Sequence, residues 1–284
     1  MASDPLPSEN KYIVPALAQG LGILSLFGGE QRSFTAPEIA AKLSLPRTTV
    51  FRLLQTLQSM DYVRYERDKR HFSLGPALLN RGFEYLASLD MVEVAQPILQ
   101  RLRDQTGLSS HLAIREGREI IYVSRFAARS TIASSVNIGT RFPVHATIMG
   151  RMTIFELSDK ELAQLFRDQP LERFTKQTPT TLKALKVLLG EDRALGYAVS
   201  QSFFEAGVSA IAAPVRDGSG RIVAAINVTA VNAHIDDRAL HGALKDAVLE
   251  AAAGISSWLC RATPVEALAA SSKPVKSRES ISYP

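Results

Sequence analysis

Apolar residues repeat at helical spacing between Thr35 and Ser59, and they predict two helices separated by a short break. Thr35 and Glu38 stand three residues apart, the spacing at which the two residue types cap a helix reciprocally. Ser44 to Pro46 should end this first helix. The second helix, from about Arg47 to Ser59, has apolar residues at the i, i+3, i+4 and i+7 positions of one buried stripe: Val50, Leu53, Leu54 and Leu57. Two short helices joined in this way present the second to a DNA major groove.

The pattern changes to that of a β-hairpin directly after the second helix. Tyr62 to Arg67 predicts one strand, Asp68 and Lys69 a tight turn, and Arg70 to Leu74 the returning strand. A hairpin in this position is the wing of a winged helix-turn-helix. Between Ser44 and Arg81 there are seven Lys or Arg residues and three acidic residues, a net charge of +4 in a chain whose total is +5. This local charge favours phosphate binding, although a three-helix packing module with a solvated charged face fits the same pattern.

We expect double-stranded DNA to contact the polar face of the second helix and the wing. Side chains on the helix should reach base edges, whereas those of the wing should contact phosphates and so bind without regard to sequence. The predicted DNA-binding residues are Thr35, Arg47, Thr48, Thr49, Arg52, Gln55, Arg64, Arg67, Lys69 and Arg70.

The length and composition of the chain predict two domains, with a polar segment at each end of the chain. A chain of 284 residues with 46% hydrophobic residues can form two ordinary cores. A first helix over Pro15 to Phe27 should bury one face, made of Leu17, Leu21, Leu24 and Phe27. We expect a disordered tail over 1–12, a winged helix-turn-helix domain over 13–76, a linker helix over 77–90, a second domain over 91–262 and a disordered tail over 263–284.

The second domain shows a mixture of strand and helix patterns that predicts an α+β fold. A helix from Val92 should end at Gly107, a residue type that favours the position after a helix. Two pairs of apolar strands flank the turns Arg115–Arg118 and Arg216–Gly220. Further helices are expected over about 148–157, 160–166, 181–194 and 236–259.

The composition argues against several other classes of protein. The single cysteine, Cys260, excludes an internal disulfide framework and fits a reducing compartment. The polar N-terminus lacks the apolar segment of a secretion signal, and no apolar run has the length of a membrane span, so we expect a cytoplasmic protein. The five histidines show no metal-ligand spacing, and no nucleophile–base arrangement stands out. We therefore expect no metal, no cofactor and no catalysis.

Several motifs follow one another along the chain: Thr35–Ala40, Leu45–Leu54, Phe72–Gly75, Ile138–Thr147, Gly196–Val199, Gly207–Val208 and Ile211–Asp217. Together and in this order, they resemble the IclR family of bacterial transcription factors. The resemblance covers about residues 13 to 260. Tyr12–Leu17 together with Gly139–Pro143 is most similar to the branch that controls aromatic-acid catabolism.

This resemblance implies a winged helix-turn-helix domain followed by a GAF-like effector-binding domain. It also implies homodimers or tetramers on palindromic or repeated operators, and effectors that are small organic acids or aromatics. By motif position, the effector pocket should include Ile148, Met149, Gln201, Ala210, Asn227 and Thr229. Asn227 and Thr229 stand two apart on one strand and therefore face the same side.

The sequence departs from the family pattern at the predicted pocket. Ser200–Phe204 replaces a segment that usually carries acidic residues, and Ile148 and Met149 stand where small residues are common. A larger and more apolar pocket is implied, which favours an aromatic or longer acid over one of glyoxylate size. The alternative is that these side chains belong to the core, where such residue types are usually found. His145 is either a hydrogen-bonded structural residue or a contact for an effector carboxylate. Arg141 is either a solvated cation in a loop or a partner for the same carboxylate.

Our main hypothesis is a ligand-responsive transcriptional regulator. The alternative is a small-molecule-binding enzyme with a helix-turn-helix-like domain that binds another protein. The basic second helix and wing argue against the enzyme. A lack of turnover of any ligand that alters DNA binding would separate the two hypotheses.

Overall fold

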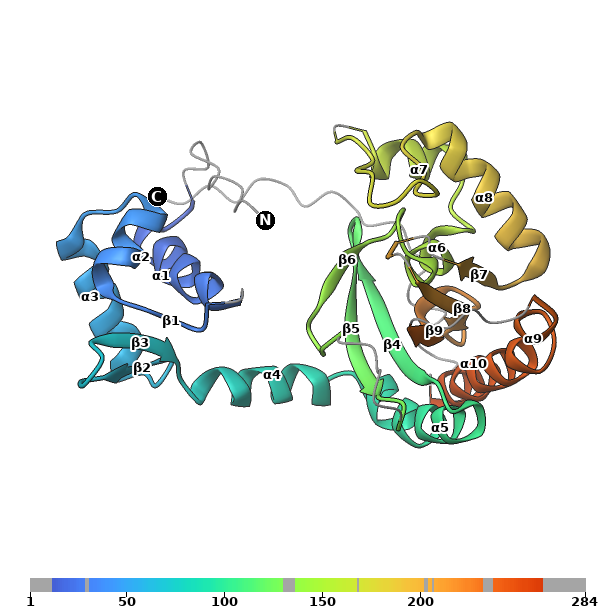
Figure 1. The fold of residues 1–284 in the computed structure, drawn as a ribbon, viewed down its shortest axis with the longest axis horizontal. Coiled ribbons are helices and arrows are strands. Elements are labelled where there is room, and N and C mark those ends of the chain that lie inside the picture. Colours follow the sequence, from blue (N-terminus) through green and yellow to red (C-terminus); the bar gives the residue numbers. More distant parts are fainter. Residues whose placement is uncertain are drawn as a thin grey trace, which may run out of the picture. The chain divides into compact units, whose positions relative to one another are not determined.

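The computed structural model describes residues 12–28, 31–129, 136–167, 169–201, 204–205, 207–231 and 237–262. Apart from Tyr12, the two predicted tails lie outside these residues. The chain divides into two compact units, 1–88 and 89–284 (Figure 1). The first unit consists of α1 (Pro15–Ser25), a 3₁₀ turn (Leu26–Gly28), β1 (Ser33–Phe34), α2 (Ala36–Leu43), α3 (Arg47–Ser59), β2 (Val63–Glu66), β3 (His71–Leu74) and α4 (Ala77–Ala87).

The helix-turn-helix is formed by α2 and α3, with the predicted caps. The Thr35 backbone N–H donates to Glu38 Oε2 at 2.7 Å, and the Glu38 N–H donates to Thr35 Oγ1 at 3.4 Å, which completes the reciprocal cap. Ser44 then ends α2 in the left-handed conformation, with φ of 53°. Val50 and Leu54 of α3 are fully buried in a core that also contains Ile23, Phe27, Phe34, Ile39, Ala40, Val63 and Phe72.

The wing is a three-stranded antiparallel sheet in the order β1-β3-β2. The predicted hairpin pairs Arg64 with Ser73 and Tyr65 with Phe72. The third strand, β1, was not predicted because a two-residue strand has no period of its own. Gly75 ends the wing where only glycine fits, since an added Cβ would lie 2.0 Å from the backbone oxygen of Asp61.

The predicted buried face of α1 was half right. Phe27 is buried and Leu24 packs against the core, whereas Leu17 and Leu21 are exposed, and Gly20 and Ile23 turn inward in their place. The inward face of α1 packs against α3, where a Cβ on Gly20 would lie at an ordinary contact distance of 3.8 Å from the side chain of Leu53. Leu17 and Leu21 stay on the surface.

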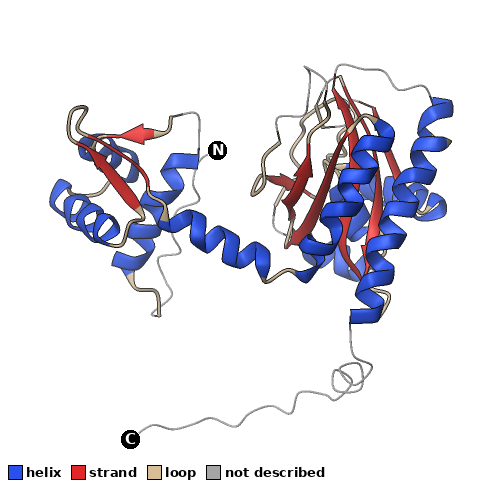
Figure 2. Cartoon of the chain, turned by 90° about the horizontal axis from the view of Figure 1, so that it is seen from below, coloured by secondary structure: helices blue, strands red, loops and turns tan. Residues whose placement is uncertain are grey.

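The second unit is built on a six-stranded antiparallel sheet in the order β6-β5-β4-β9-β8-β7 (Figure 2). Its strands are β4 (Ser109–Glu116), β5 (Glu119–Phe126), β6 (Arg141–Pro143), β7 (Ala198–Gln201), β8 (Val208–Arg216) and β9 (Ile222–Val231). Its helices are α5 (Asp90–Thr106), α6 (Ile148–Ile154), α7 (Asp159–Leu165), α8 (Leu182–Leu195), α9 (Asp237–Leu240) and α10 (Ala243–Ala262).

Helices cover this sheet, and so its central strands are buried on both faces. Helices α5 and α10 pack together and against β4, β8 and β9, while α6 packs against the other face (Figure 1). Successive side chains of each strand point alternately to the α5 and α10 face and to the α6 face. In β8, Ala210 and Ala212 belong to the core cluster that contains α6, and Ile211 between them points to the opposite side.

Two further predictions about the second unit needed correction. The expected single closing helix over 236–259 is divided into α9 and α10 by a turn at His241 and Gly242. Strand β6 was not recognised as a strand, because its three residues pair with Glu119–Ile121 far away in the sequence. The predicted α+β class is confirmed. Within the described residues, no helix is long and apolar enough to span a membrane.

Candidate DNA interface and effector cavity

Helix α3 presents a polar face to solvent, opposite Val50 and Leu54. Arg47, Thr48, Arg52 and Gln55 are exposed on it, and Thr49 is half-buried. Phe51 lies on the same surface, with 56% of its side chain exposed. A helix of 13 residues that offers two guanidiniums, hydroxyls and an amide on one face has the groups that read base edges in a major groove.

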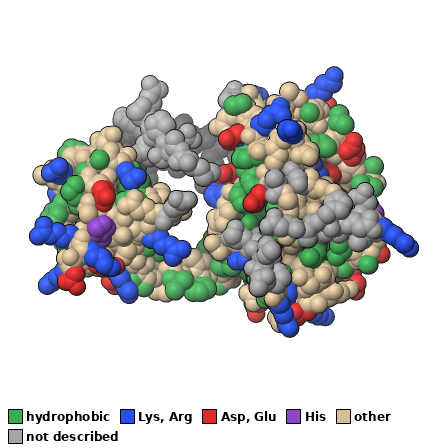
Figure 3. All heavy atoms as spheres, viewed as in Figure 1, with side chains coloured by type: hydrophobic (Ala, Val, Ile, Leu, Met, Phe, Trp, Pro, Cys, Tyr) green, Lys and Arg blue, Asp and Glu red, His purple; other side chains and the backbone are tan. Residues whose placement is uncertain are grey.

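The wing adds positive charge to the same unit. Its four predicted contact residues are all exposed: Arg64, Arg67, Lys69 and Arg70. Arg70 has φ of 55°, a left-handed conformation that closes the turn between β2 and β3. Lys69 lies 3.2 Å from Glu66, an exposed pair of small energetic weight. Figure 3 shows Lys and Arg side chains gathered on the surface of this unit.

Thr35 has a structural role at the start of α2. Its hydroxyl donates to Glu38 Oε2 at 2.9 Å and accepts the Glu38 N–H. Both hydrogen-bonding capacities are therefore used within the helix cap, and a DNA contact by Thr35 stays a prediction.

In the second unit, a cavity lies between the sheet and the N-terminal end of α6. Strands β4, β5, β8 and β9 supply its floor, and residues just before α6 supply one wall. Aromatic rings form much of its side. The lining residues are His111, Tyr122, Val136, Phe142, Ala146, Thr147, Ile148, Ser200, Phe204, Glu205, Val208, Ala210, Asn227 and Thr229.

The structure brings together four of the six predicted effector residues: Ile148, Ala210, Asn227 and Thr229. Met149 is fully buried and is not among the lining residues; it lies about 100° around α6 from Ile148. Gln201 is not among the lining residues. Its neighbour Ser200 is, and successive side chains of a strand point to opposite faces.

Sequence reasoning missed His111, Tyr122, Phe142 and Phe204 as cavity residues. His111 pairs in register with Asn227 across β4 and β9, which puts both side chains on the same face of the sheet. The only sequence signal was the alternation along β4, and it does not reveal the partner strand.

A chain of hydrogen bonds crosses the cavity floor. His111 Nδ1 lies 2.9 Å from Asn227 Oδ1, and Asn227 Nδ2 donates to Thr229 Oγ1 at 3.0 Å. Burial lowers the pKa of His111 to about 4, an effect that Arg125 reinforces and the Asn227 hydrogen bond opposes. Burial also raises the pKa of Tyr122. At neutral pH both rings are uncharged.

Arg141 and His145, the two candidate partners for an effector carboxylate, are placed elsewhere. Arg141 forms ion pairs with Glu119 at 2.7 Å and Glu116 at 3.0 Å on the surface. His145 Nε2 lies 3.0 Å from the Glu172 carbonyl oxygen. Neither residue lines the cavity, so the solvated and structural interpretations hold for them.

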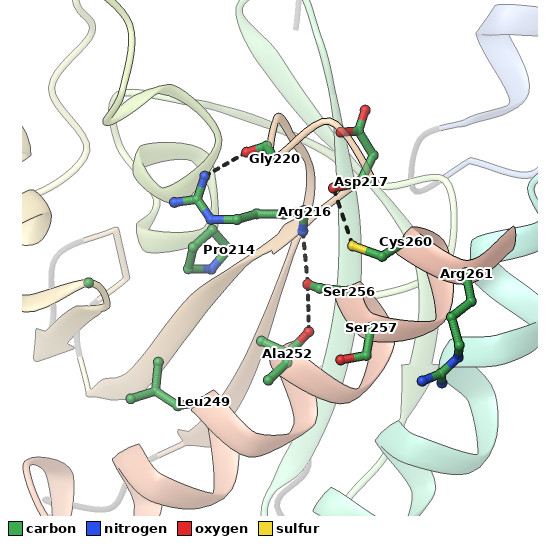
Figure 4. Close-up of a pocket in the computed structure, with 13 residues that line it drawn as sticks. Pro214, Arg216, Asp217, Gly220, Leu249, Ala252, Ser256, Ser257, Cys260 and Arg261 are labelled. Carbon is green, nitrogen blue, oxygen red and sulfur yellow. Dashed lines mark hydrogen bonds between the residues drawn. The ribbon is translucent and has the colours of Figure 1, made fainter. Parts of the chain in front are cut away.

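A second, more open hollow lies between α10 and the turn that joins β8 to β9 (Figure 4). Several of its polar groups already bond to one another. The Arg216 N–H donates to Ser256 Oγ at 2.9 Å, and Ser256 Oγ in turn donates to the Ala252 carbonyl. Cys260 Sγ lies 3.7 Å from the Asp217 carbonyl oxygen. The cavity beside α6 is therefore the better candidate for the effector site. Among the described residues, no cluster of His, Cys, Asp or Glu could hold a metal ion.

Comparison with known proteins decides the family. Residues 16–67 match the IclR helix-turn-helix domain, and residues 83–257 match the C-terminal domain of IclR bacterial transcriptional regulators. The chain belongs to the IclR family. XynR of Escherichia coli, an HTH-type transcriptional regulator, is 31% identical over 228 residues, which is 80% of this chain and 90% of XynR.

Solved structures agree with this assignment. A transcriptional regulator from Rhodococcus sp. RHA1 is 34% identical with a TM-score of 0.80, over 88% of this chain and 100% of that one. An IclR homolog from Microbacterium hydrocarbonoxydans, solved in complex with 4-hydroxybenzoate, has the same fold, with a TM-score of 0.76 at 24% identity over 87% of this chain and all of the other. The chain is thus an IclR-family, DNA-binding transcriptional regulator with an effector domain.

Proposed function

We propose that this IclR-family regulator binds operator DNA through α3 and the wing and releases or engages it in response to a small aromatic acid. The genes it controls would then serve the catabolism of such acids. The observation that carries the aromatic assignment is the row of rings along the effector cavity.

Three rings in that row line the cavity directly. Tyr122 and Phe142 meet edge to face with ring centroids 5.7 Å apart, and Phe142 lies 4.7 Å from Phe204. Phe174 extends the row beyond the cavity, 4.8 Å from Phe204. Such edge-to-face and tilted arrangements are the ones aromatic groups prefer, so a ligand ring would add one more favourable contact. A short aliphatic acid has no ring and would make no such contact.

The cavity is well placed to couple ligand binding to structure. Ile148, which lines it, is the first residue of α6, and α6 packs against α8 as well as against the sheet. An effector shifts the DNA-binding equilibrium only by its difference in affinity for the two states of the protein. We propose that the position of α6 against the sheet is what differs between those states.

We also propose a homodimer or tetramer, supported by apolar surface on the first unit. Leu79 and Phe83 of α4 are each 60% exposed, and no described residue of that helix is buried. Leu17 and Leu21 of α1 are exposed as well. Clustered apolar residues on a surface commonly mark a protein–protein interface. Sedimentation of the full chain, beside a Leu79→Ser/Phe83→Ser variant that should be monomeric, tests this.

The proposed function is tested by measuring DNA affinity with and without ligand. Fluorescence anisotropy of the full chain on DNA from its own gene neighbourhood should respond to benzoate-type acids and not to short aliphatic acids. Thr229→Val should weaken the response and leave DNA affinity without ligand unchanged, because Thr229 lies in the effector cavity of the second unit and not in the unit that carries α3 and the wing. Ser219→Ala, in the turn beside the open hollow, is the matched control and should behave like the parent.

Two results would count against this function. A chain that binds no DNA with sequence preference is not the proposed regulator. The cavity is not used as proposed if the chain binds DNA but neither class of acid changes its affinity for DNA. The same holds if an acid changes the DNA affinity of the parent and of Thr229→Val equally. Turnover of any acid that alters DNA binding would instead favour the enzyme alternative.

A further inference from the structure

We propose that Nε2 of His111 accepts a hydrogen bond from a hydroxyl group of the effector, so that the cavity selects hydroxylated acids over their unsubstituted counterparts. This inference rests on the effector cavity proposed above and adds to it the chemical group that the cavity recognises.

The hydrogen bonds on the cavity floor fix which nitrogen of His111 carries the proton. Asn227 Nδ2 donates to Thr229 Oγ1, so the other end of the amide, Oδ1, faces His111. An amide oxygen can only accept, and therefore His111 Nδ1 must be the N–H that donates to it. In a neutral imidazole the second nitrogen then has a lone pair and no proton. Nε2 is that nitrogen.

The lone pair on Nε2 has no partner within the described part of the chain. Only 1% of the His111 side chain is exposed, and Nε2 is a buried polar atom without a hydrogen bond. Buried polar atoms are nearly always satisfied, because an unpaired one loses its hydration without compensation. His111 is also a lining residue of the effector cavity. A ligand donor in the cavity would satisfy this atom.

The remaining lining argues that the donor is a neutral hydroxyl. None of the described lining residues is a Lys or Arg that could pair with a carboxylate beside His111, and Glu205 adds an acidic side chain to the lining. Burial keeps the His111 ring uncharged at neutral pH. A carboxylate placed against the Nε2 lone pair would meet acceptor against acceptor. A phenol or an alcohol offers an O–H that the lone pair can accept.

The first test uses the parent protein and needs no variant. Calorimetry of the full chain compares each monohydroxybenzoate isomer with benzoate and with the methoxybenzoate of the same substitution. At least one hydroxybenzoate should bind about tenfold or more tightly than benzoate, because it satisfies a buried acceptor that benzoate leaves unpaired. Its methoxy counterpart keeps the oxygen but lacks the donor, and should lose this advantage. Equal affinities for the hydroxy and methoxy acids, or no binding of any hydroxybenzoate, would overturn the proposal.

The second test observes the nitrogen itself. Long-range ¹H–¹⁵N spectra of the full chain labelled with ¹⁵N-histidine distinguish a ring nitrogen that carries a proton from one that has a lone pair. We expect Nε2 of His111 to be unprotonated near neutral pH, and its resonance to move when the preferred hydroxybenzoate is added. A proton on Nε2 in the ligand-free protein would contradict the proposal whichever acids bind.

A pair of variants tests whether His111 causes the preference for hydroxylated acids. His111→Phe keeps an aromatic ring but removes both nitrogens, and should bind hydroxybenzoate no better than benzoate. Phe142→Leu, which alters the aromatic wall, should weaken all the acids by a similar factor and keep the preference for a hydroxyl. If His111→Phe retains that preference, the acceptor is another group.

The DNA measurement separates failure of this inference from failure of the proposed function. Acids that release DNA with no preference for a hydroxyl would overturn the role of His111 and leave the regulator intact. Acids that bind with the expected preference for a hydroxyl but leave DNA affinity unchanged would support the role of His111 and overturn the proposed regulation.

Discussion

Arg151 of α6 and Asp192 of α8 form an ion pair inside the second unit, with Arg151 Nε 2.8 Å from Asp192 Oδ2. A second contact of 3.1 Å joins Arg151 Nη2 to Asp192 Oδ1, and only 3% and 7% of the two side chains are exposed. Nη2 also donates to the Val199 carbonyl oxygen of β7. Burial raises the pKa of Asp192 to about 6 and lowers that of Arg151, so each charge depends on the other. The pair fixes α6, which begins at the effector cavity, to α8 and β7.

We expect Arg151→Met to lower the free energy of unfolding of this unit by about 3–5 kcal/mol, because it leaves the Asp192 carboxylate buried and unpaired. Replacing both residues, as Arg151→Met/Asp192→Leu, should cost less than the single change. Urea unfolding followed by the fluorescence of Trp258, the one tryptophan of the chain, reports on this unit.

Arg129→Met is the matched control. Arg129 also pairs with an aspartate, Asp104 at 3.3 Å, but its side chain is 80% exposed. Its removal should change stability by about 1 kcal/mol or less. Similar effects of Arg151→Met and Arg129→Met would show that the buried pair does not hold α6 in place.

A second prediction concerns Gly150, at the third position of α6. A Cβ there would lie 2.3 Å from the Val144 Cα and 2.4 Å from its carbonyl oxygen, and backbone atoms cannot move aside as a flexible side chain can. We expect Gly150→Ala to destabilise the unit by about 1–3 kcal/mol. Gly190→Ala in α8 should be neutral or stabilise by up to about 1 kcal/mol, since no atom lies within 4 Å of its added Cβ and alanine favours a helix. Trp258 fluorescence measures both, and the same sign for both would refute the steric argument.

How much the sequence predicted depended on the range of the interactions involved. The cap between Thr35 and Glu38 spans three residues, and the buried stripe of α3 lies within one helix, so local spacing was enough to find both. The face of α1 was only half right, because the side of α1 that is buried depends on how the helix packs against α3, which is distant in the sequence. Arg151 and Asp192 lie in separate helices, and no local period connects them.

The effector cavity shows the same limit. The family motif placed Asn227 and Thr229 correctly on one face of a strand. It did not reveal His111, which is 116 residues from Asn227 in the sequence and reaches it only through the pairing of β4 with β9. Met149 and Gln201, which were predicted for the same pocket, are not among the residues that line this cavity. Each is one position from a residue that does, and one step along a helix or strand changes the side chain's direction.

A third prediction tests α3 as the recognition helix. Arg52 is exposed on the polar face of α3, whereas Leu54 is fully buried. Arg52→Ala should weaken binding to the specific operator by about 1–3 kcal/mol, the value of one good base contact, and leave the fold intact. Leu54→Ala should instead destabilise the first unit by about 2–5 kcal/mol. Anisotropy and thermal melting by circular dichroism measure the two effects. An Arg52→Ala chain that binds operator like the parent would contradict the role assigned to α3.

A fourth prediction concerns the wing. Neutralising Lys69 and Arg70, both exposed in the β2–β3 turn, should weaken binding to all DNA sequences alike. The slope of log K against log salt should become shallower by about 0.9 for each phosphate that the wing no longer neutralises. Lys160→Gln, at an exposed site in the second unit, should leave the slope unchanged. An unchanged slope, with weaker binding to one operator alone, would mean that the wing reads bases.

A fifth prediction follows from the pKa of His111, which burial lowers to about 4 from its ordinary value of 6.5. In the unfolded chain this ring takes up a proton near pH 6.5, whereas in the folded protein it stays neutral until about pH 4. The unfolded state therefore binds more protons in this window, and stability falls as the pH is lowered through it. The contribution of His111 to the free energy of unfolding is fully present above pH 6.5, and about 3 kcal/mol of it is lost by pH 4.

The free energy of unfolding is measured by urea unfolding, followed by Trp258 fluorescence, over this pH range. It should fall more steeply with decreasing pH for the parent than for His111→Gln. Other groups titrate in the same window, but the difference between the two proteins removes their effect. Parallel curves for the parent and His111→Gln would show that His111 is not held neutral by burial.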